Sequence, residues 1–211
     1  DELMILDIDA TSLGYEPNFD LISKISAECR MPLCYGGGVK TSQQAQRIID
    51  MGVEKVAISS AFIENPMLVS EIASAVGNQS VVAVIDFQKK TGLFSKGYEV
   101  CTHNATKVHN LDPIKLASEL QEIGVGEIIF NSIDLDGSMQ GYDLEIAKNL
   151  KKNLKVPMTM LGGAGSLEDI SNLFDSVGLV GAAVGSLFVF KGKYRAVLIN
   201  YPTPDQKFAI C

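Results

Sequence analysis

The stretch VVAVIDF, residues 81–87, decides the fold. Its first five residues are all apolar, and the run then meets a single carboxylate, Asp86. A strand that is apolar at every position leaves no face for water, which is typical of a parallel sheet covered by helices. The stretch therefore predicts a buried parallel strand that ends in an acid.

The same pattern recurs along the chain as short apolar runs, each closed by Gly, Ser or Asp and followed by apolar positions at helical spacing. We expect about seven strands, at 3–8, 32–35, 55–58, 81–85, 127–131, 156–161 and 181–184. Helices are expected at 41–51, 66–76, 113–123, 144–150 and 167–174, with Thr41 or Ser42, Asp112 and Ser166 among the capping residues.

Strict alternation of strands and helices predicts an α/β fold, either a doubly wound sheet or a (β/α)8 barrel. An open sheet concentrates its chemistry at one switch point, whereas here nearly every strand ends in a small or acidic residue. These residues are Asp7, Gly36, Ser59, Asp86, Asp134, Gly162 and Gly185. The pattern favours the TIM barrel.

About seven strands do not close an eight-stranded barrel, so we expect part of the ring to be missing and residues 1–211 to form a single barrel domain. An incomplete barrel exposes two strand edges, which predicts self-association or poor solubility. The segment 92–102 is expected to be a hairpin insertion on the active face.

Composition excludes several classes of protein. The 211 residues are 46% apolar and 20% charged with a net charge of −7, which is typical of one globular domain and gives no basic surface for nucleic acid or anionic lipid. No apolar run approaches the roughly 18 residues of a membrane span. The four cysteines have no CxxC spacing, so we expect no metal, no cofactor and a cytoplasmic location.

Two glycine clusters, at 36–38 and 162–165, each follow a strand and precede a helix. Glycine allows backbone N–H groups to approach a phosphate, although a single cluster is more often only a tight turn. The strands that come next end in Ser59-Ser60 and Gly185-Ser186, which add hydroxyl and amide donors. The pairing predicts two phosphate sites on opposite sides of one mouth, as a long bisphosphate ligand requires.

Acidic residues end three of the strands: Asp7 and Asp9, Asp86, and Asp134 and Asp136. A lone Asp there can simply cap the next helix. Three acidic strand ends at one mouth favour acid/base chemistry instead. Asp86 ends the most apolar run, so burial should tune its carboxyl for proton transfer.

Other candidates are weaker. His103 and His109 lie in a polar stretch, THNATKVHN, which is more typical of a solvated loop than of a metal site. Glu2, Lys55 and Glu127 each stand at the start of a strand. Spacing alone favours simple solvation of these ends over a charged ring where a partner docks.

The chain resembles the cyclase subunit of imidazole glycerol phosphate synthase (HisF) in several ordered motifs. These are DELMILDIDATS, PLCYGGGVKT, EKVAISSAFIENP, VVAVIDF, GVGEIIFNSIDLDGSMQGYDLE, PMTMLGGAGSLED and GSLFVF. The resemblance implies a (β/α)8 barrel that receives ammonia from a glutaminase subunit (HisH) on its bottom face. It also implies conversion of the bisphosphate ribonucleotide PRFAR to imidazole glycerol phosphate and AICAR, in histidine biosynthesis.

Carried over by motif, Asp86 looks like one of two catalytic aspartates and Asp136 like the acid beside the second phosphate. Gly38, Ser59 and Ser60 resemble one phosphate cradle, and Gly137, Gly163 and Ser186 the other. The glycine clusters themselves add Gly37, Gly162 and Gly185 to the expected binding residues. Asp7, Asn131 and Asp134 are expected to contact substrate. Glu2, Lys55 and Glu127 resemble three of the four residues that gate ammonia, which shifts the balance toward the docking ring.

Some positions depart from the family pattern. The other catalytic aspartate belongs to the missing first strand, Ser59 stands where the family usually has Asn, and Asn131 where it usually has Thr. The tail KYRAVLINYP resembles HisF-like proteins associated with sugar amidation in surface-polysaccharide synthesis. The alternatives to the cyclase are therefore an ammonia-handling component of a sugar amidotransferase, and a non-catalytic phosphate-binding barrel fragment.

Overall fold

A computed structural model of the protein describes residues 1–91, 96–103, 105–192 and 194–210. In this part of the chain one curled sheet contains seven strands in the order β1-β2-β3-β4-β7-β8-β9, and each neighbouring pair is parallel. They span Leu3–Leu6 (β1), Leu33–Gly36 (β2), Lys55–Ile58 (β3), Val81–Lys89 (β4), Glu127–Ser132 (β7), Met158–Leu161 (β8) and Gly181–Ala182 (β9). The predicted α/β class and parallel sheet are confirmed.

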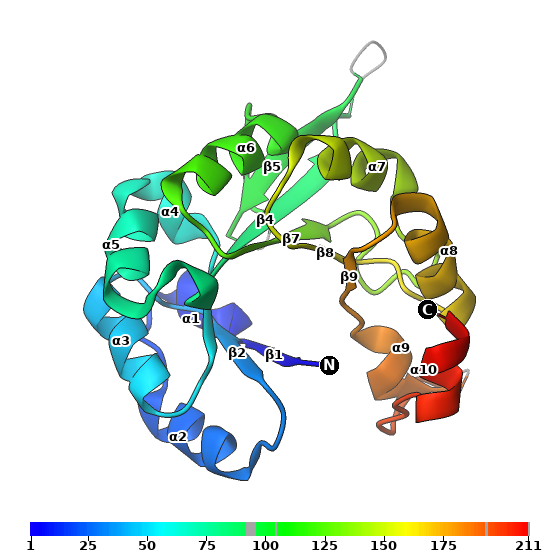
Figure 1. Ribbon diagram of the computed structural model, residues 1–211, viewed down its shortest axis with the longest axis horizontal. Helices are drawn as coiled ribbons and strands as arrows, with labels where there is room; N and C mark the ends of the chain where they lie inside the picture. The colour runs from blue at the N-terminus through cyan, green and yellow to red at the C-terminus, as the bar shows by residue number, and fades with distance from the viewer. Residues whose placement is uncertain (92–95, 104, 193, 211) are drawn as a thin grey trace.

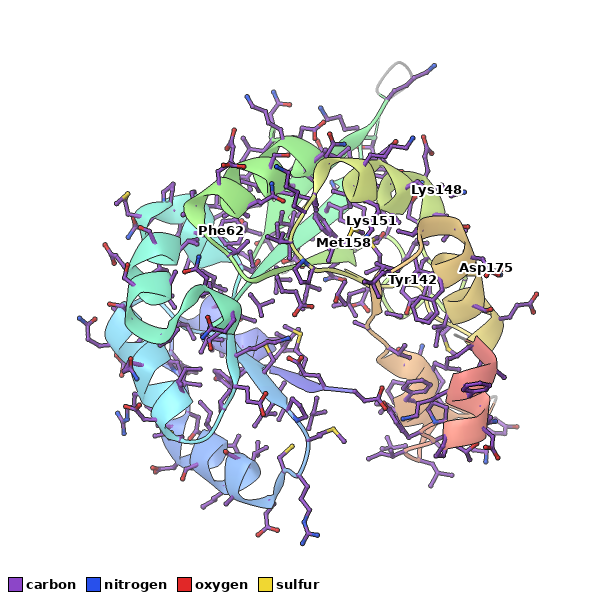
Figure 2. The ribbon with its side chains drawn as sticks, viewed as in Figure 1. Phe62, Tyr142, Lys148, Lys151, Met158 and Asp175 are labelled. Atoms are coloured by element: carbon purple, nitrogen blue, oxygen red, sulfur yellow. The ribbon has the colours of Figure 1, made fainter. Side chains whose placement is uncertain are left out.

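Helices cover the outer side of the curved sheet (Figure 1). In chain order they are α1 (Ile8–Leu13), α2 (Phe19–Glu28), α3 (Ser42–Asp50), α4 (Ser60–Glu64), α5 (Met67–Val76), the short 3-10 helix η1 (Asn78–Ser80), α6 (Pro113–Ile123), α7 (Leu144–Asn153), α8 (Leu167–Val177), α9 (Ser186–Val189) and α10 (Pro204–Ile210). Lys148 and Asp175 lie on the outer helices α7 and α8, whereas Met158 lies on the strand arc (Figure 2).

The predicted helix starts are confirmed by their caps. The Thr41 side chain accepts from the Gln44 backbone while Gln44 bonds back to the cap, and Ser166 forms the same reciprocal box with Asp169. Asp112 caps α6, whose first position is Pro113. Local side-chain chemistry therefore sets where these helices begin.

The main differences from the prediction are two strand ends and one helix that was not expected. The expected strand 3–8 ends at Leu6, because the Asp7 carboxylate accepts from the backbone N–H groups of Asp9 and Ala10 and starts α1. The expected strand 181–184 is only Gly181–Ala182. Helix α2 was not predicted, although Asn18 caps it in the usual way.

The sheet forms an open arc in the part of the chain that the structure describes, because β1 and β9 pair with β2 and β8 but not with each other. Figure 1 shows the two ends of the arc, with α9 and α10 beside one of them. A curled parallel sheet with outer helices agrees with the barrel family. An eight-stranded ring that lacks its first unit stays a prediction, and so does self-association.

The predicted hairpin insertion is confirmed for the described residues. β5 (Tyr98–Thr102) pairs antiparallel with the end of β4, and β6 (Lys107–His109) pairs with β5. Residues 92–95 of the expected insertion lie outside the described residues. A second, smaller hairpin joins β10 (Phe190–Lys191) to β11 (Ala196–Val197).

Side chains alternate across each strand, so the curled sheet has an outer and an inner row. Outer positions of β4 such as Val81 and Ile85 belong to the large core shared with the helices. Inner positions such as Val82 and Val84 pack in a smaller cluster with Cys34, Ala57 and Ile129. The inner face is thus filled by small apolar side chains, with polar residues before and after them along the strands.

Candidate active site at the strand mouth

The inner row decides which polar side chains meet at the carboxyl ends of the strands. Asp86 follows Val82 and Val84 at the period of two, and Asn131 follows Ile129 in the same way. Both side chains therefore project into the mouth of the curled sheet rather than into the helix layer. The alternation in VVAVIDF is the local reason that the carboxylate faces inward.

The mouth contains a cavity of about 710 Å³. Eight of the predicted site residues line it: Asp7, Gly37, Gly38, Ser59, Ser60, Asp86, Asn131 and Asp136. They come from the ends of β1, β2, β3, β4 and β7, so five strand ends converge on one space. This is the arrangement in which barrels of this kind build active sites.

Asp86 has a defined set of partners. Asn131 Nδ2 donates to its Oδ1 at 2.8 Å, and the Ser59 hydroxyl donates to its Oδ2 at 3.3 Å. Burial raises the pKa of Asp86, the two hydrogen bonds oppose that change, and the nearby Asp136 charge adds to it. The net effect is a raised pKa, which brings the carboxyl closer to neutral pH and suits it to proton transfer.

Ser59 has only one hydroxyl proton, and in this arrangement the proton goes to Asp86. When Asp86 is protonated it can donate to Ser59 instead, and the Ser59 hydroxyl then becomes available to a ligand. Proton transfer at Asp86 and hydrogen bonding by Ser59 are thus coupled.

Two acceptors in the mouth lack protein donors. Asn131 Oδ1 is buried without a hydrogen-bond partner, and no described residue donates to the Asp136 side chain. A buried acceptor without a donor costs free energy of about 1–3 kcal/mol. Asn131 Oδ1 is therefore ready to accept from an N–H or O–H group of a ligand, which offsets that cost on binding, whereas the exposed Asp136 carboxylate is open to water.

The remaining predicted acids have structural partners. Asp7 caps α1, with its Oδ1 at 3.2 Å from Asp9 N and 3.1 Å from Ala10 N, while it also lines the cavity. Asp134 Oδ2 accepts from the backbone N–H of Lys89 at 2.8 Å, which fastens the base of the hairpin to β7. Asp134 is not in the lining of the cavity.

The first glycine cluster lies in the cavity because of its backbone. Gly38 has φ +70°, and a Cβ there would lie 2.7 Å from the carbonyl oxygen of Tyr15. Only glycine fits this position. The chain can therefore turn tightly below the cavity and leave its backbone open to a ligand.

The second cluster is separate from that cavity. A Cβ on Gly137 would lie 3.9 Å from Ser186 Oγ, whereas one on Gly185 would meet no atom within 4 Å. Gly162 and Gly163 both have positive φ and pack closely on neighbouring backbone. Gly137, Gly162, Gly163, Gly185 and Ser186 are absent from the lining of the 710 Å³ cavity.

Charged residues meet at the opposite, amino end of the strands. Lys55 Nζ lies 2.6 Å from Glu2 Oε2 and 2.8 Å from Glu127 Oε2, and Thr159 donates to Glu127 Oε1 at 2.7 Å. Burial alone would lower the pKa of Lys55, but the hydrogen bonds to both glutamates raise it. The three predicted residues thus form one ion-pair cluster, which we call the amino-end cluster.

The inner row joins this cluster to the mouth. Cys34 and Ala57 lie between them, packed with Val82, Val84 and Ile129. Burial raises the pKa of the Cys34 thiol, so it stays protonated and weakly nucleophilic. Small and apolar interior side chains suit the passage of a small neutral molecule better than that of an ion.

Sequence reasoning missed four polar residues that line the cavity: Thr11, Lys40, Glu64 and His103. The prediction of a solvated loop holds only in part: His103 lies in the turn after β5, whereas His109 belongs to β6, and both side chains are only partly exposed. The register of the hairpin brings His103 to the mouth, and only the pairing with β4 fixes that register. No motif in the sequence carries this signal.

The described part of the chain contains no group of three or more His, Cys, Asp or Glu side chains placed to hold a metal ion. No helix within the described ranges is long and apolar enough to cross a membrane. The residues that line the mouth carry carboxyl, hydroxyl, amide and imidazole groups.

Residues 1–195 match the family model described as histidine biosynthesis protein. The chain is 53% identical over 207 residues to "Putative imidazole glycerol phosphate synthase subunit hisF3" of Vibrio vulnificus, covering 98% of this chain and 79% of the relative. It is 53% identical over 210 residues to "Putative imidazole glycerol phosphate synthase subunit HisF" of Leptospira borgpetersenii, covering 100% and 82%. The subunit HisF of Exiguobacterium sibiricum is 36% identical over 188 residues, covering 89% and 74%.

Proposed function

Because the chain belongs to the histidine biosynthesis protein family, we propose that it is the cyclase subunit of an imidazole glycerol phosphate synthase. This activity uses ammonia to convert PRFAR to imidazole glycerol phosphate and AICAR. The observation that carries the proposal is Asp86, a carboxyl of raised pKa in a polar cavity at the end of a barrel strand.

The chemistry explains why such a carboxyl is needed. When ammonia attacks a carbon centre, the new nitrogen must lose protons and a leaving oxygen or nitrogen must gain one. A carboxyl with a pKa raised toward neutrality can do both in turn. Asp86 is the group assigned to this proton transfer, and Ser59 and Asn131 position it through their hydrogen bonds.

Two anion sites fit the two ends of the substrate. Gly37, Gly38 and Ser60 would hold one phosphate beside the cavity, and Gly137, Gly163 and Ser186 the other. Asp136 lines the cavity and directly precedes Gly137 in the chain. Asn131 Oδ1 offers the reacting part of the substrate an acceptor.

Ammonia would enter at the amino-end cluster. Glu2, Lys55 and Glu127 present paired charges at the bottom of the sheet, where a HisH-like glutaminase subunit would dock. The apolar inner row around Cys34 and Ala57 then leads toward Asp86. Rearrangement of the Lys55 ion pairs would open this route.

A reducing, cytoplasmic location is also proposed. The described cysteines, Cys29, Cys34 and Cys101, are all free thiols. Burial raises the pKa of Cys101 to about 11, so its thiol stays protonated at neutral pH. Inert reduced thiols are typical of proteins that work in a reducing compartment.

The direct test is turnover of PRFAR with ammonium chloride, followed by release of AICAR. The proposal expects turnover by the wild-type chain and its loss in Asp86→Asn, while the surface variant Asp175→Asn on α8 keeps it. Turnover that survives in Asp86→Asn would remove Asp86 from the chemistry. Binding of PRFAR without turnover would favour the non-catalytic barrel.

A second candidate is an ammonia-handling component of a sugar amidotransferase complex. The tail favours it: Arg195 in the β10–β11 hairpin donates from Nη2 to Ser186 Oγ at 3.4 Å, so the distinctive tail touches a predicted phosphate residue. Ser59 in place of the family's usual Asn also favours it. Stimulation of a sugar-linked glutaminase by this chain, with no turnover of PRFAR, would select this candidate.

A further inference from the structure

The hairpin beside β4 carries a histidine into the mouth. His103 follows β5 directly, and it lines the cavity together with Ser60, Glu64 and Asp86. The β4–β5 pair rises from the arc of strands in Figure 1. The proposed function does not use this imidazole.

The strand register explains how His103 reaches the cavity. Cys101 pairs with Asp86, and cross-strand partners project from the same face of a sheet. His103 lies two residues farther on, in the turn that follows β5, and it lines the cavity from there. Its backbone has φ +53°, which is uncommon for a residue other than glycine and costs about 1 kcal/mol or more.

A hydroxyl links the two imidazoles of the hairpin. Thr102 Oγ1 lies 2.8 Å from His109 Nε2 and 3.2 Å from His103 Nδ1. A hydroxyl has one proton, so it donates to one ring and accepts from the other. When it donates to His103 Nδ1, the proton of the neutral His103 ring is on Nε2.

The Nε2 atom of His103 faces a carboxylate. Glu64 Oε1 lies 3.7 Å away, an arrangement that favours a proton on Nε2. The Glu64 side chain is 64% exposed, so it can move into solvent at little cost. Nε2–H is therefore a donor at the cavity that Glu64 holds only loosely.

The same histidine is connected to the first anion site. Its backbone N–H donates to Ser60 Oγ at 3.3 Å, so the Ser60 oxygen is used as an acceptor. Among the described residues no acceptor takes the Ser60 hydroxyl proton. Ser60 O–H and His103 Nε2–H are thus two donors at one part of the cavity, on segments joined by a hydrogen bond.

We propose that His103 is a phosphate-binding residue of the first anion site, where its Nε2–H donates to a phosphate oxygen that Ser60 also binds. Glu64 lies against the imidazole Nε2 at 3.7 Å and competes with the phosphate for it. The ligand class is a phosphomonoester dianion. This inference rests on the proposed function, because that function supplies the phosphate.

The chain has only two histidines, which makes a direct test possible. Imidazole ring signals of His103 and His109 are recorded by nuclear magnetic resonance on the full chain, assigned with His109→Gln, while inorganic phosphate is added. The expected result is a saturable shift of the His103 ring signals. No shift of these signals at saturating phosphate would overturn the proposal, and so would the absence of any phosphate binding.

Two variants separate a binding role from a structural one. His103→Asn keeps a residue type that tolerates positive φ and removes Nε2, so we expect phosphate affinity to fall by about tenfold. Glu64→Gln removes the competitor and should raise the affinity by about threefold. Unchanged affinity in His103→Asn, or weaker binding in Glu64→Gln, would contradict the proposal.

Turnover distinguishes this inference from the proposed function. If both hold, His103→Asn raises KM for PRFAR and leaves kcat within about twofold, since the lost bond is made equally in ground and transition states. If only the His103 inference fails, Asp86→Asn still abolishes turnover while His103→Asn leaves KM unchanged. If only the proposed function fails, phosphate still shifts the His103 signals but PRFAR is not converted.

Discussion

Polar groups at the amino end of the curled sheet have close partners, whereas some polar groups at the mouth have none. At the amino-end cluster Lys55 lies within 2.8 Å of two glutamates, and Thr159 binds one of them. At the mouth Asn131 Oδ1 has no donor and the Asp86 carboxyl is shifted toward its neutral form. Both ends are built on the same strands, so the difference comes from which side chains end each inner row.

The contrast separates stability from chemistry. A charge with close partners of opposite sign stabilises the fold or holds a passage closed, whereas a polar group without a partner costs free energy that a ligand can offset. Substitutions at the mouth should therefore reduce activity more than stability. Substitutions at the amino-end cluster should reduce stability more than activity.

The largest expected effect is that of Asp86→Asn. The exchange removes the proton-transferring carboxyl, so turnover of PRFAR with ammonia should fall by about a hundredfold or more. The folded state raises the pKa of Asp86, which means that the ionised carboxylate lowers stability at pH values above its folded pKa. At neutral pH the variant should thus be at least as stable as the wild type, as measured by urea unfolding.

Asp175→Asn, on the exposed side of α8, is the matched control. It should change neither turnover nor the urea midpoint. A large loss of stability in Asp86→Asn would show that the mouth, like the other end, is mainly structural.

Lys55→Met tests the amino-end cluster. It leaves Glu2 and Glu127 close together without a cation, so we expect a loss of about 1–3 kcal/mol in the free energy of unfolding, with ammonia-dependent turnover retained. The raised pKa of Lys55 means that its contribution is fully present at neutral pH and is lost only as pH rises through the folded value. Urea unfolding measures the effect.

Lys24→Met on α2 is the control, because this lysine is exposed. Its urea midpoint should match the wild type. An equal loss of unfolding free energy in Lys55→Met and Lys24→Met would mean that the ion pairs of Lys55 contribute nothing to stability.

Ser166→Ala examines a satisfied polar group on the mouth side. Ser166 accepts from Asp169 N at 3.1 Å and caps α8, so its loss should cost about 1 kcal/mol of stability and leave KM and kcat unchanged. Ser166→Asp, which can also cap a helix, should restore most of the loss. A change in kcat without a change in stability would contradict the expectation that polar groups with hydrogen-bond partners act on stability and not on activity.

The smallest effect is expected for Asn131→Leu in the pH profile. The Asn131 hydrogen bond lowers the pKa of Asp86 against burial, so its removal should raise that pKa further. The acid limb of kcat/KM should then move to higher pH. The change is measured by recording kcat/KM against pH for the wild type and for Asn131→Leu over the acid range. An acid limb at the same pH in both would show that the limb reports a group other than Asp86.

Much of the fold could be predicted because the signals are local. The strand at Lys55–Ile58 and the helix Pro113–Ile123 match the predicted bounds, since an apolar run and an Asp-Pro cap need no distant partner. The expected strand 3–8 failed for a local reason as well: Asp7 was interpreted as a strand end, but it caps α1.

The site was predicted in part. Asp86, Ser59 and Asn131 lie together as expected, because each ends an inner row of a parallel strand. Asp134 instead fastens the hairpin through Lys89, and His103 enters the cavity through a pairing register that no local pattern reveals. A contact such as that between Lys89 N and Asp134, 45 residues apart in the chain, depends on how the sheet curls.

The sequence by itself determined the strands, the helix caps and the polar residues that end each inner row, because alternation and capping act within a few residues. Only the tertiary structure decided which of these groups have partners. It left Asn131 Oδ1 without a donor, and it joined Lys55 to both glutamates. The physical reason is that burial and long-range pairing set the free energy of a polar group, and neither is encoded by its neighbours in the chain.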